Sequence, residues 1–137
     1  MKKKIRIILD TNIWISFLIT KSMKGIDKLI FNDKAVLLFS DESMIEFIDV
    51  TDREKLKPYF TKDDIASLID LIEEYGEIVE VQSKVDICRD KEDNFLLSLA
   101  KDGKADYLIT GDKDLLVLEN FGKTEMIKLT DFLEKYR

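Results

Sequence analysis

The sequence contains no histidine, only one cysteine and only one proline. Without histidine, Ser-His-Asp and Cys-His catalysis, imidazole-ligated zinc and histidine general bases are all excluded. The single cysteine, Cys88, cannot form an internal disulfide and is compatible with a reducing, cytoplasmic setting. Any chemistry must therefore use carboxylates, lysine, tyrosine, hydroxyl groups or a bound metal.

Long apolar runs, repeats and low-complexity segments are also missing. The lysines at 2–4 are similar to the start of a signal peptide, but Arg6 interrupts the apolar run that follows and Asp10 stops it. No stretch approaches the length needed to cross a membrane. We therefore expect a cytoplasmic protein without a membrane segment.

What is present is typical of one folded domain. The chain has 137 residues, 45% of them hydrophobic, so it can bury a core, and we expect a single domain over residues 1–137. Its 22 Lys and Arg against 28 Asp and Glu give a net charge of −6. This balance argues against a protein that coats nucleic acid. It allows a nucleic-acid enzyme, because divalent cations reverse the local charge of an acidic site.

Short apolar runs alternate with helical patterns along the chain. Runs that predict β-strands cover 5–9, 36–39, 78–81, 107–109 and 126–129. Helical patterns cover 12–19, 24–32, 43–50, 92–102, 114–121 and 131–136, and a further helix begins after Thr61 and ends before Gly76. Most of these strands are apolar throughout, as parallel strands covered on both faces are. We predict a three-layer α/β/α sandwich with a mostly parallel central sheet of about five strands.

Acidic residues follow four of the predicted strands. Asp10 ends the first strand and Asp112 follows the fourth, while Glu46 and Asp93 lie in the helices after the second and third. Ligands bind beyond the carboxyl ends of the strands in such sheets, so we expect all four acids at one rim. Crowded carboxylates repel one another, and Mg²⁺ or Mn²⁺ relieves the repulsion through oxygen ligands. The four acids are therefore candidate metal ligands and catalytic groups for phosphodiester hydrolysis.

Four further residues are candidates to support this site. Asn12 and Thr110 could orient water or phosphate. Asp90 and Asp114 are more typical of residues that cap helices or lie behind the metal ligands.

The acids also have structural interpretations. Asp10 and Asp112 could each cap the helix that follows, and Asp93 could be a favourable acid in a first helical turn. Glu46 has apolar neighbours on both sides and is harder to explain as a solvated surface residue. Independent structural roles do not explain why all four acids follow strands.

Four segments resemble motifs of the PIN-domain ribonucleases, especially the VapC-like toxins of prokaryotic toxin–antitoxin systems. They are residues 8–13, 43–47, 89–96 and 105–116, and the resemblance covers essentially the whole chain in order. The first and fourth segments carry most of the likeness. One departure is Lys91, which stands where related chains often have proline, and it should alter loop stiffness but not ligation.

This resemblance implies a parallel-sheet sandwich and a Mg²⁺- or Mn²⁺-dependent endoribonuclease. The metal ligands of the family fall on Asp10, Glu46, Asp93 and Asp112. The resemblance also implies an RNA substrate, an antitoxin that blocks the acidic site, and often a homodimer. An interface could use the apolar residues of the first two predicted helices: Trp14, Phe17, Ile26, Ile30 and Phe31.

Two other functions stay open. The acidic rim could dock a basic peptide, such as an antitoxin tail, without catalysis. A phosphoryl-transfer enzyme or receiver-like domain built on Asp10 fits less well. A haloacid-dehalogenase-type phosphatase would have an acid where Asn12 stands, and residues 81–83 provide no phosphoacceptor aspartate.

Overall fold

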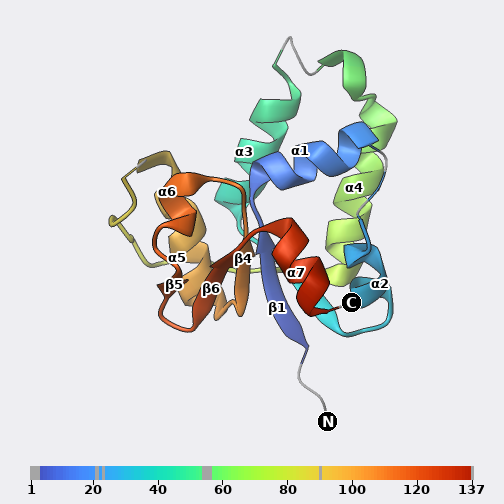
Figure 1. The fold of residues 1–137 in the computed structure, drawn as a ribbon. Helices are drawn as coiled ribbons and strands as arrows, with labels where there is room; N and C mark the ends of the chain where they lie inside the picture. The colour runs from blue at the N-terminus through green and yellow to red at the C-terminus, as the bar shows by residue number, and fades with distance from the viewer. Residues whose placement is uncertain (1–3, 21, 23, 54–56, 90, 137) are drawn as a thin grey trace.

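The computed structural model describes residues 4–20, 22, 24–53, 57–89 and 91–136 (Figure 1). Helices and strands alternate along the chain. In order they are β1 (Ile5–Leu9), α1 (Thr11–Thr20), α2 (Ile26–Phe31), β2 (Ala35–Phe39), α3 (Asp41–Thr51), the 3₁₀ turn η1 (Lys57–Tyr59), α4 (Lys62–Tyr75), β3 (Gly76–Ile78), the 3₁₀ turn η2 (Lys91–Asp93), α5 (Asn94–Gly103), β4 (Tyr107–Ile109), α6 (Lys113–Leu116), β5 (Asn120–Phe121), β6 (Thr124–Ile127) and α7 (Leu129–Lys135). None of the helices in the described ranges has the length and apolar character required to traverse a bilayer.

The strands form one sheet in the order β3-β2-β1-β4-β6-β5. All neighbouring pairs are parallel except β5 and β6, which are antiparallel. The predicted mostly parallel α/β sandwich is therefore confirmed, with a short sixth strand at one edge. Successive strands run outward from β1 to β3, and the chain then returns to place β4 on the other side of β1. This change of direction leaves a crevice at the carboxyl ends of β1 and β4.

Apolar residues cover both faces of the sheet because successive side chains of a strand point in opposite directions. On β1, Ile7 and Leu9 join the core cluster beneath α1, α2, α3, α4 and α7, whereas Ile8 joins the cluster beneath α5 and α6. Figure 1 shows these two helical layers on either side of the strands. Burial on both faces explains why the predicted strands lack polar alternation.

Three predicted elements were wrong in their extent. The strand predicted over 126–129 is Thr124–Ile127, and Leu129 already begins α7. The third strand begins at Gly76, directly after α4, so only Ile78 of the predicted range 78–81 belongs to it. The predicted helix 114–121 ends at Leu116. Glu119 then adopts a left-handed backbone with φ 60°, and residues 120–121 pair with β6 instead. Pairing with a neighbouring strand thus overrides local helical spacing in this segment.

The core uses most of the residues that suggested a dimer interface. Trp14, Phe17, Ile26 and Ile30 are buried, and the Trp14 ring contacts Phe17 and Phe39. Phe31 alone of that set is exposed, and its ring packs edge-on against Tyr75. The homodimer stays a prediction. The apolar residues of these helices no longer support it, because most of them are buried in the core of one chain.

Candidate active site

A cavity of about 190 Å³ opens at the carboxyl ends of β1 and β4. All four acids predicted from the sequence line it, and so does Asn12. The lining residues are Asp10, Thr11, Asn12, Glu46, Val50, Arg53, Asp93, Phe95, Leu96 and Asp112. Side chains that are up to about a hundred positions apart in the chain thus share one polar space, which we call the acid cavity.

Asp10 directly follows β1 and is only 7% exposed. Its Oδ2 accepts a hydrogen bond of 2.7 Å from the Thr110 hydroxyl, and its carboxylate also accepts from the backbone N–H groups of Asn12 and Thr11. Burial raises the pKa of Asp10 above its usual value, the hydrogen bonds oppose this, and the nearby Asp112 charge raises the pKa further. A cation near Asp10 would therefore stabilise the charged form of its carboxylate.

Thr110 connects two of the acids. Its hydroxyl donates to Asp10 and accepts the backbone N–H of Asp112 at 3.0 Å. Because Thr110 is fully buried, it positions Asp10 and has no surface to present to a phosphate. Thr110 therefore supports the site by positioning Asp10 and not by orienting phosphate.

Asp112 combines two roles that the sequence left as alternatives. Its Oδ1 accepts the backbone N–H of Asp114 at 2.8 Å and caps α6. The same side chain lines the acid cavity. The capping interpretation is correct and does not remove Asp112 from the site.

Glu46 and Asp93 come from helical segments. A capping box between Ser40 and Ser43 begins α3 and places Glu46 in its second turn, half-buried. Asp93 is the last residue of η2, and its Oδ2 is buried. Its side chain makes no capping hydrogen bond to α5, so helix capping does not account for this acid.

Two polar residues that sequence reasoning missed hold the segment before η2 against α5. Asn94 Oδ1 accepts the N–H groups of Ile87 and Cys88 at 3.2 and 2.9 Å, and Ser98 Oγ accepts the N–H of Val85. Both side chains are buried. Their spacing of four residues within an apolar helix was the signal that could have identified them.

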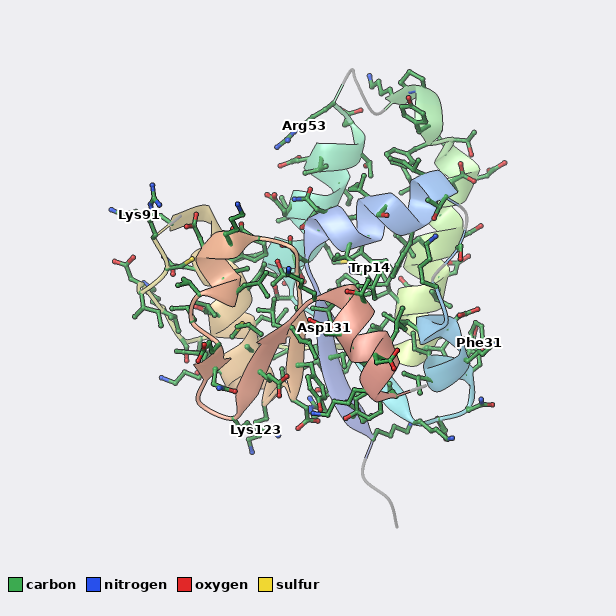
Figure 2. All side chains as sticks on the ribbon, viewed as in Figure 1. Trp14, Phe31, Arg53, Lys91, Lys123 and Asp131 are labelled. Atoms are coloured by element: carbon green, nitrogen blue, oxygen red, sulfur yellow. The ribbon has the colours of Figure 1, made fainter. Side chains whose placement is uncertain are left out.

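Arg53 is the one basic residue among those that line the acid cavity. It lies after α3, and Figure 2 shows its side chain extending away from the helix. It forms no ion pair with another described residue. A neighbouring cavity of about 380 Å³ shares Glu46, Arg53 and Phe95 with the acid cavity. No sequence pattern indicated Arg53, because its position depends on where α3 ends.

The remaining supporting candidates lie elsewhere. Asp114 does not line the acid cavity, and its carboxylate is 4.0 Å from Arg89 Nη1. Asp90 lies outside the described residues.

The donor set of the acid cavity suits a hard divalent cation. All four acids offer oxygen ligands, which Mg²⁺ and Mn²⁺ prefer. In the described part of the chain, Asp10, Glu46 and Asp112 form no ion pair with Lys or Arg. Across the same residues, no group of three acids is yet arranged to hold a metal ion. The oxygen chemistry of these residues nevertheless fits such an ion.

Comparisons with known proteins give a matching family model and a similar protein. A sequence model described as a PIN domain matches residues 6–114, a range that contains all four acids. The chain is also similar to MJ1680, an uncharacterised protein of Methanocaldococcus jannaschii. The two are 33% identical over 125 residues, which cover 89% of this chain and 80% of the relative.

Proposed function

Because the chain belongs to the PIN-domain family, whose members are typically nucleases, we propose that it is a metal-dependent endoribonuclease that hydrolyses RNA phosphodiester bonds. The convergence of Asp10, Glu46, Asp93 and Asp112 on one cavity is the observation that carries this proposal. The aspartates and the glutamate would be the ligands of Mg²⁺ or Mn²⁺. When bound, such an ion supplies an activated water and offsets the charge that develops on the phosphate.

The chain's own residues orient the reacting groups. Thr110 fixes Asp10, and the backbone N–H of Asp114 fixes Asp112, so two acids keep their positions when RNA enters. Asn12, exposed at the cavity, has an amide that can donate to a phosphate oxygen. Arg53 adds a guanidinium suited to phosphate, and in an otherwise acidic cavity it offsets repulsion of the RNA backbone.

Substituting Asp10 tests this proposal. In the Asp10→Asn variant, Mg²⁺- or Mn²⁺-dependent cleavage of single-stranded RNA should fall at least about a hundredfold, because a ligand charge is lost while the side-chain shape is kept. Circular dichroism should show an unchanged fold. Asp70→Asn, an exposed acid on α4, is the matched control and should cleave like the wild type.

Two results would contradict the proposal. One is equal cleavage by the wild type and Asp10→Asn, and the other is cleavage that continues in EDTA. A wild type that never cleaves RNA with either metal would instead support a binding module, in which the acidic rim docks a basic peptide.

We further propose that the chain is the toxin of a toxin–antitoxin pair and that its antitoxin covers the acid cavity. Exposed Ile45 on α3 lines the neighbouring cavity together with Glu46 and would suit a segment with both basic and apolar residues. Expression of the wild type should stop cell growth, and expression of Asp10→Asn should not. The predicted homodimer is tested by sedimentation, and a monomer at micromolar concentration would count against it.

A further inference from the structure

Another cavity, of about 370 Å³ and separate from the two described above, lies at the opposite end of α5 from the acid cavity. The start of α5 brings Phe95 and Leu96 to the acid cavity, and its end brings Ala100 and Lys101 to this other cavity. With ten residues, α5 is about 15 Å long. These two cavities are therefore separate, and we call the one near Lys101 the lysine cavity.

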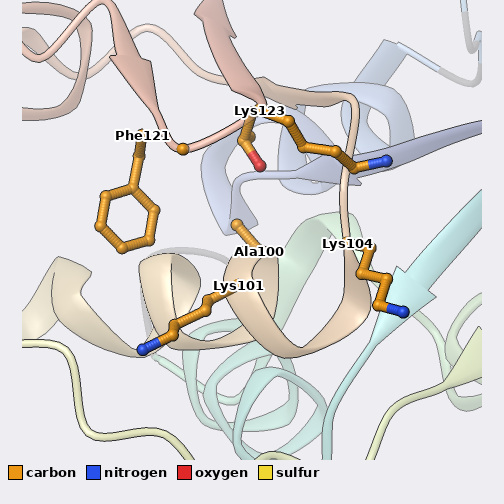
Figure 3. A pocket seen from close by; sticks show the side chains of 7 residues that line it. Ala100, Lys101, Lys104, Phe121 and Lys123 are labelled. Carbon is orange, nitrogen blue, oxygen red and sulfur yellow. The ribbon is translucent and has the colours of Figure 1, made fainter.

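Three lysines from different parts of the chain line the lysine cavity with their side chains, and Figure 3 shows their ammonium groups at its rim. Lys101 is in the last turn of α5, Lys104 directly follows that helix, and Lys123 lies in the turn between β5 and β6. Figure 3 shows Lys101 and Phe121 on one side of the cavity and Lys104 and Lys123 on the other, with Ala100 between them. Because Asp106 pairs with Lys123, the local positive charge is that of Lys101 and Lys104, in a chain whose net charge is −6.

The two acids closest in sequence to Lys101 and Lys104 already have partners. Asp102 accepts hydrogen bonds from the backbone N–H groups of Gln82 and Ser83 at 2.7 and 2.8 Å. Asp106 binds Lys123 Nζ at 3.2 Å. Within the described ranges, Lys101 and Lys104 form no ion pair. Their ammonium groups are thus available to an anionic ligand.

Lys104 has an unfavourable backbone conformation for a lysine. Its φ of 54° is in the left-handed region, where glycine is the favoured residue after a helix. Cations near a helix carboxyl end do stabilise the helix, which is a structural reason for Lys101 and Lys104. That reason does not extend to Lys123 and Phe121, which belong to a separate hairpin on the same cavity.

The apolar part of the cavity indicates the kind of anion. Phe121 is half-buried and presents its ring beside a floor that includes buried Ala100. A ligand that uses every part of this site needs a negative charge for the lysines and a flat apolar face for the ring. Nucleotides of single-stranded nucleic acid have both, since phosphates pair with lysine and bases stack on aromatic rings. An acidic peptide would use the lysines without the ring.

We propose that the lysine cavity binds a short stretch of single-stranded RNA, outside the bond that is cut, with one base on Phe121 and successive phosphates near Lys101 and Lys104. The choice of RNA over other single-stranded nucleic acids rests on the proposed nuclease function. The acid cavity is negatively charged and repels the RNA backbone. Lysine contacts at a second site would attract the same RNA and so offset this repulsion.

Binding is measured by fluorescence anisotropy with a long single-stranded RNA, using the Asp10→Asn chain so that the RNA stays intact. Adding Lys101→Gln and Lys104→Gly should weaken binding about tenfold and reduce the slope of log affinity against log salt by about 1.4, or about 0.7 for each lost phosphate contact. Lys104→Gly also relieves the left-handed lysine, so the fold is maintained. Phe121→Leu keeps the apolar packing and should weaken binding with little change in the salt slope. The control is Lys57→Gln with Lys62→Gln, an equal charge change at η1 and α4.

Unchanged affinity in the lysine variant would overturn the proposal, and so would an equal loss in the control. If polyglutamate binds as tightly as RNA and Phe121→Leu changes neither affinity, the site takes an acidic protein and the RNA assignment is wrong. Failure of the nuclease proposal is recognised separately, because an inactive wild type could still bind RNA through these lysines.

Discussion

Thr110 shows how one uncharged residue can control the acids of the site. Its hydroxyl donates one hydrogen bond to the Asp10 carboxylate and accepts another from the backbone N–H of Asp112. Thr110→Val keeps the shape but removes both bonds, at a cost of about 1–3 kcal/mol in unfolding free energy. The pKa of Asp10 should then rise further, because a hydrogen bond that lowers it is gone. The acid limb of the RNA cleavage profile should move to higher pH.

The matched variant for this change is Thr110→Ser, which retains the hydroxyl. It should keep the wild-type pH profile, and its cleavage rate is the reference for Thr110→Val. An acid limb at the same pH in all three proteins would mean that the ionisation of Asp10 does not limit the reaction.

A second prediction concerns stability and follows from the raised pKa of Asp10. The folded protein holds this proton more tightly than the unfolded chain, so the contribution of Asp10 to stability is greatest at low pH and is lost as pH rises through the folded-state pKa. Asp10→Asn carries no charge at any pH. In EDTA it should therefore unfold at a higher temperature than the wild type at pH 7, with a difference that shrinks on acidification. A wild type that is the more stable protein at pH 7 would contradict this.

The four acids were the part of the site that the sequence could predict. Asp10 and Asp112 follow buried strands, and the parallel topology determines which rim they occupy. Arg53 was not predicted, and Thr110 was predicted to orient water or phosphate, whereas its buried hydroxyl positions Asp10. Their roles depend on where a helix ends and on how deeply a turn is covered, and neither is encoded in local spacing.

At the level of secondary structure, periodicity located the helices and strands whose apolar faces pack on the sheet. Periodicity gave the wrong element or the wrong bounds where contacts with distant parts of the chain determine the secondary structure. Gly76 ends α4 and begins β3 without a loop, because an added Cβ would lie 2.6 Å from the Ile72 carbonyl oxygen and only glycine permits this close approach. Residues 120–121 form a strand only because β6 is beside them.

The capping box of α3 should affect the site, because the second turn of this helix carries Glu46. Ser40→Ala removes the side chain that accepts from Ser43 N–H, and should cost about 1 kcal/mol in urea unfolding. It should also weaken Mg²⁺ binding, measured by calorimetry. Thr61→Ala removes the equivalent cap of α4 and should lower stability without changing Mg²⁺ affinity. Equal Mg²⁺ affinities in the two variants would show that the start of α3 does not position Glu46.

For the whole molecule, the distribution of charge links stability to the cation. An ion that binds only the folded chain stabilises it by about 2.7 kcal/mol at a hundred times its dissociation constant. Mg²⁺ should therefore raise the unfolding temperature of the wild type by several degrees and that of Asp10→Asn by much less. Sodium chloride at matched ionic strength accounts for simple screening of the negative charge. Identical shifts with the two salts would indicate that no specific site exists.

The four acids of the cavity differ in how firmly they are anchored. Asp10 is joined to the sheet through its backbone N–H to Ile109, and Asp112 is fixed by Thr110 and the start of α6. Glu46 and Asp93 instead lie on a helix and a 3₁₀ turn outside the sheet. A cation held by all four acids would therefore cross-link two strand ends to α3 and η2. The affinity for the metal would then depend on the placement of these two elements as well as on the acids themselves.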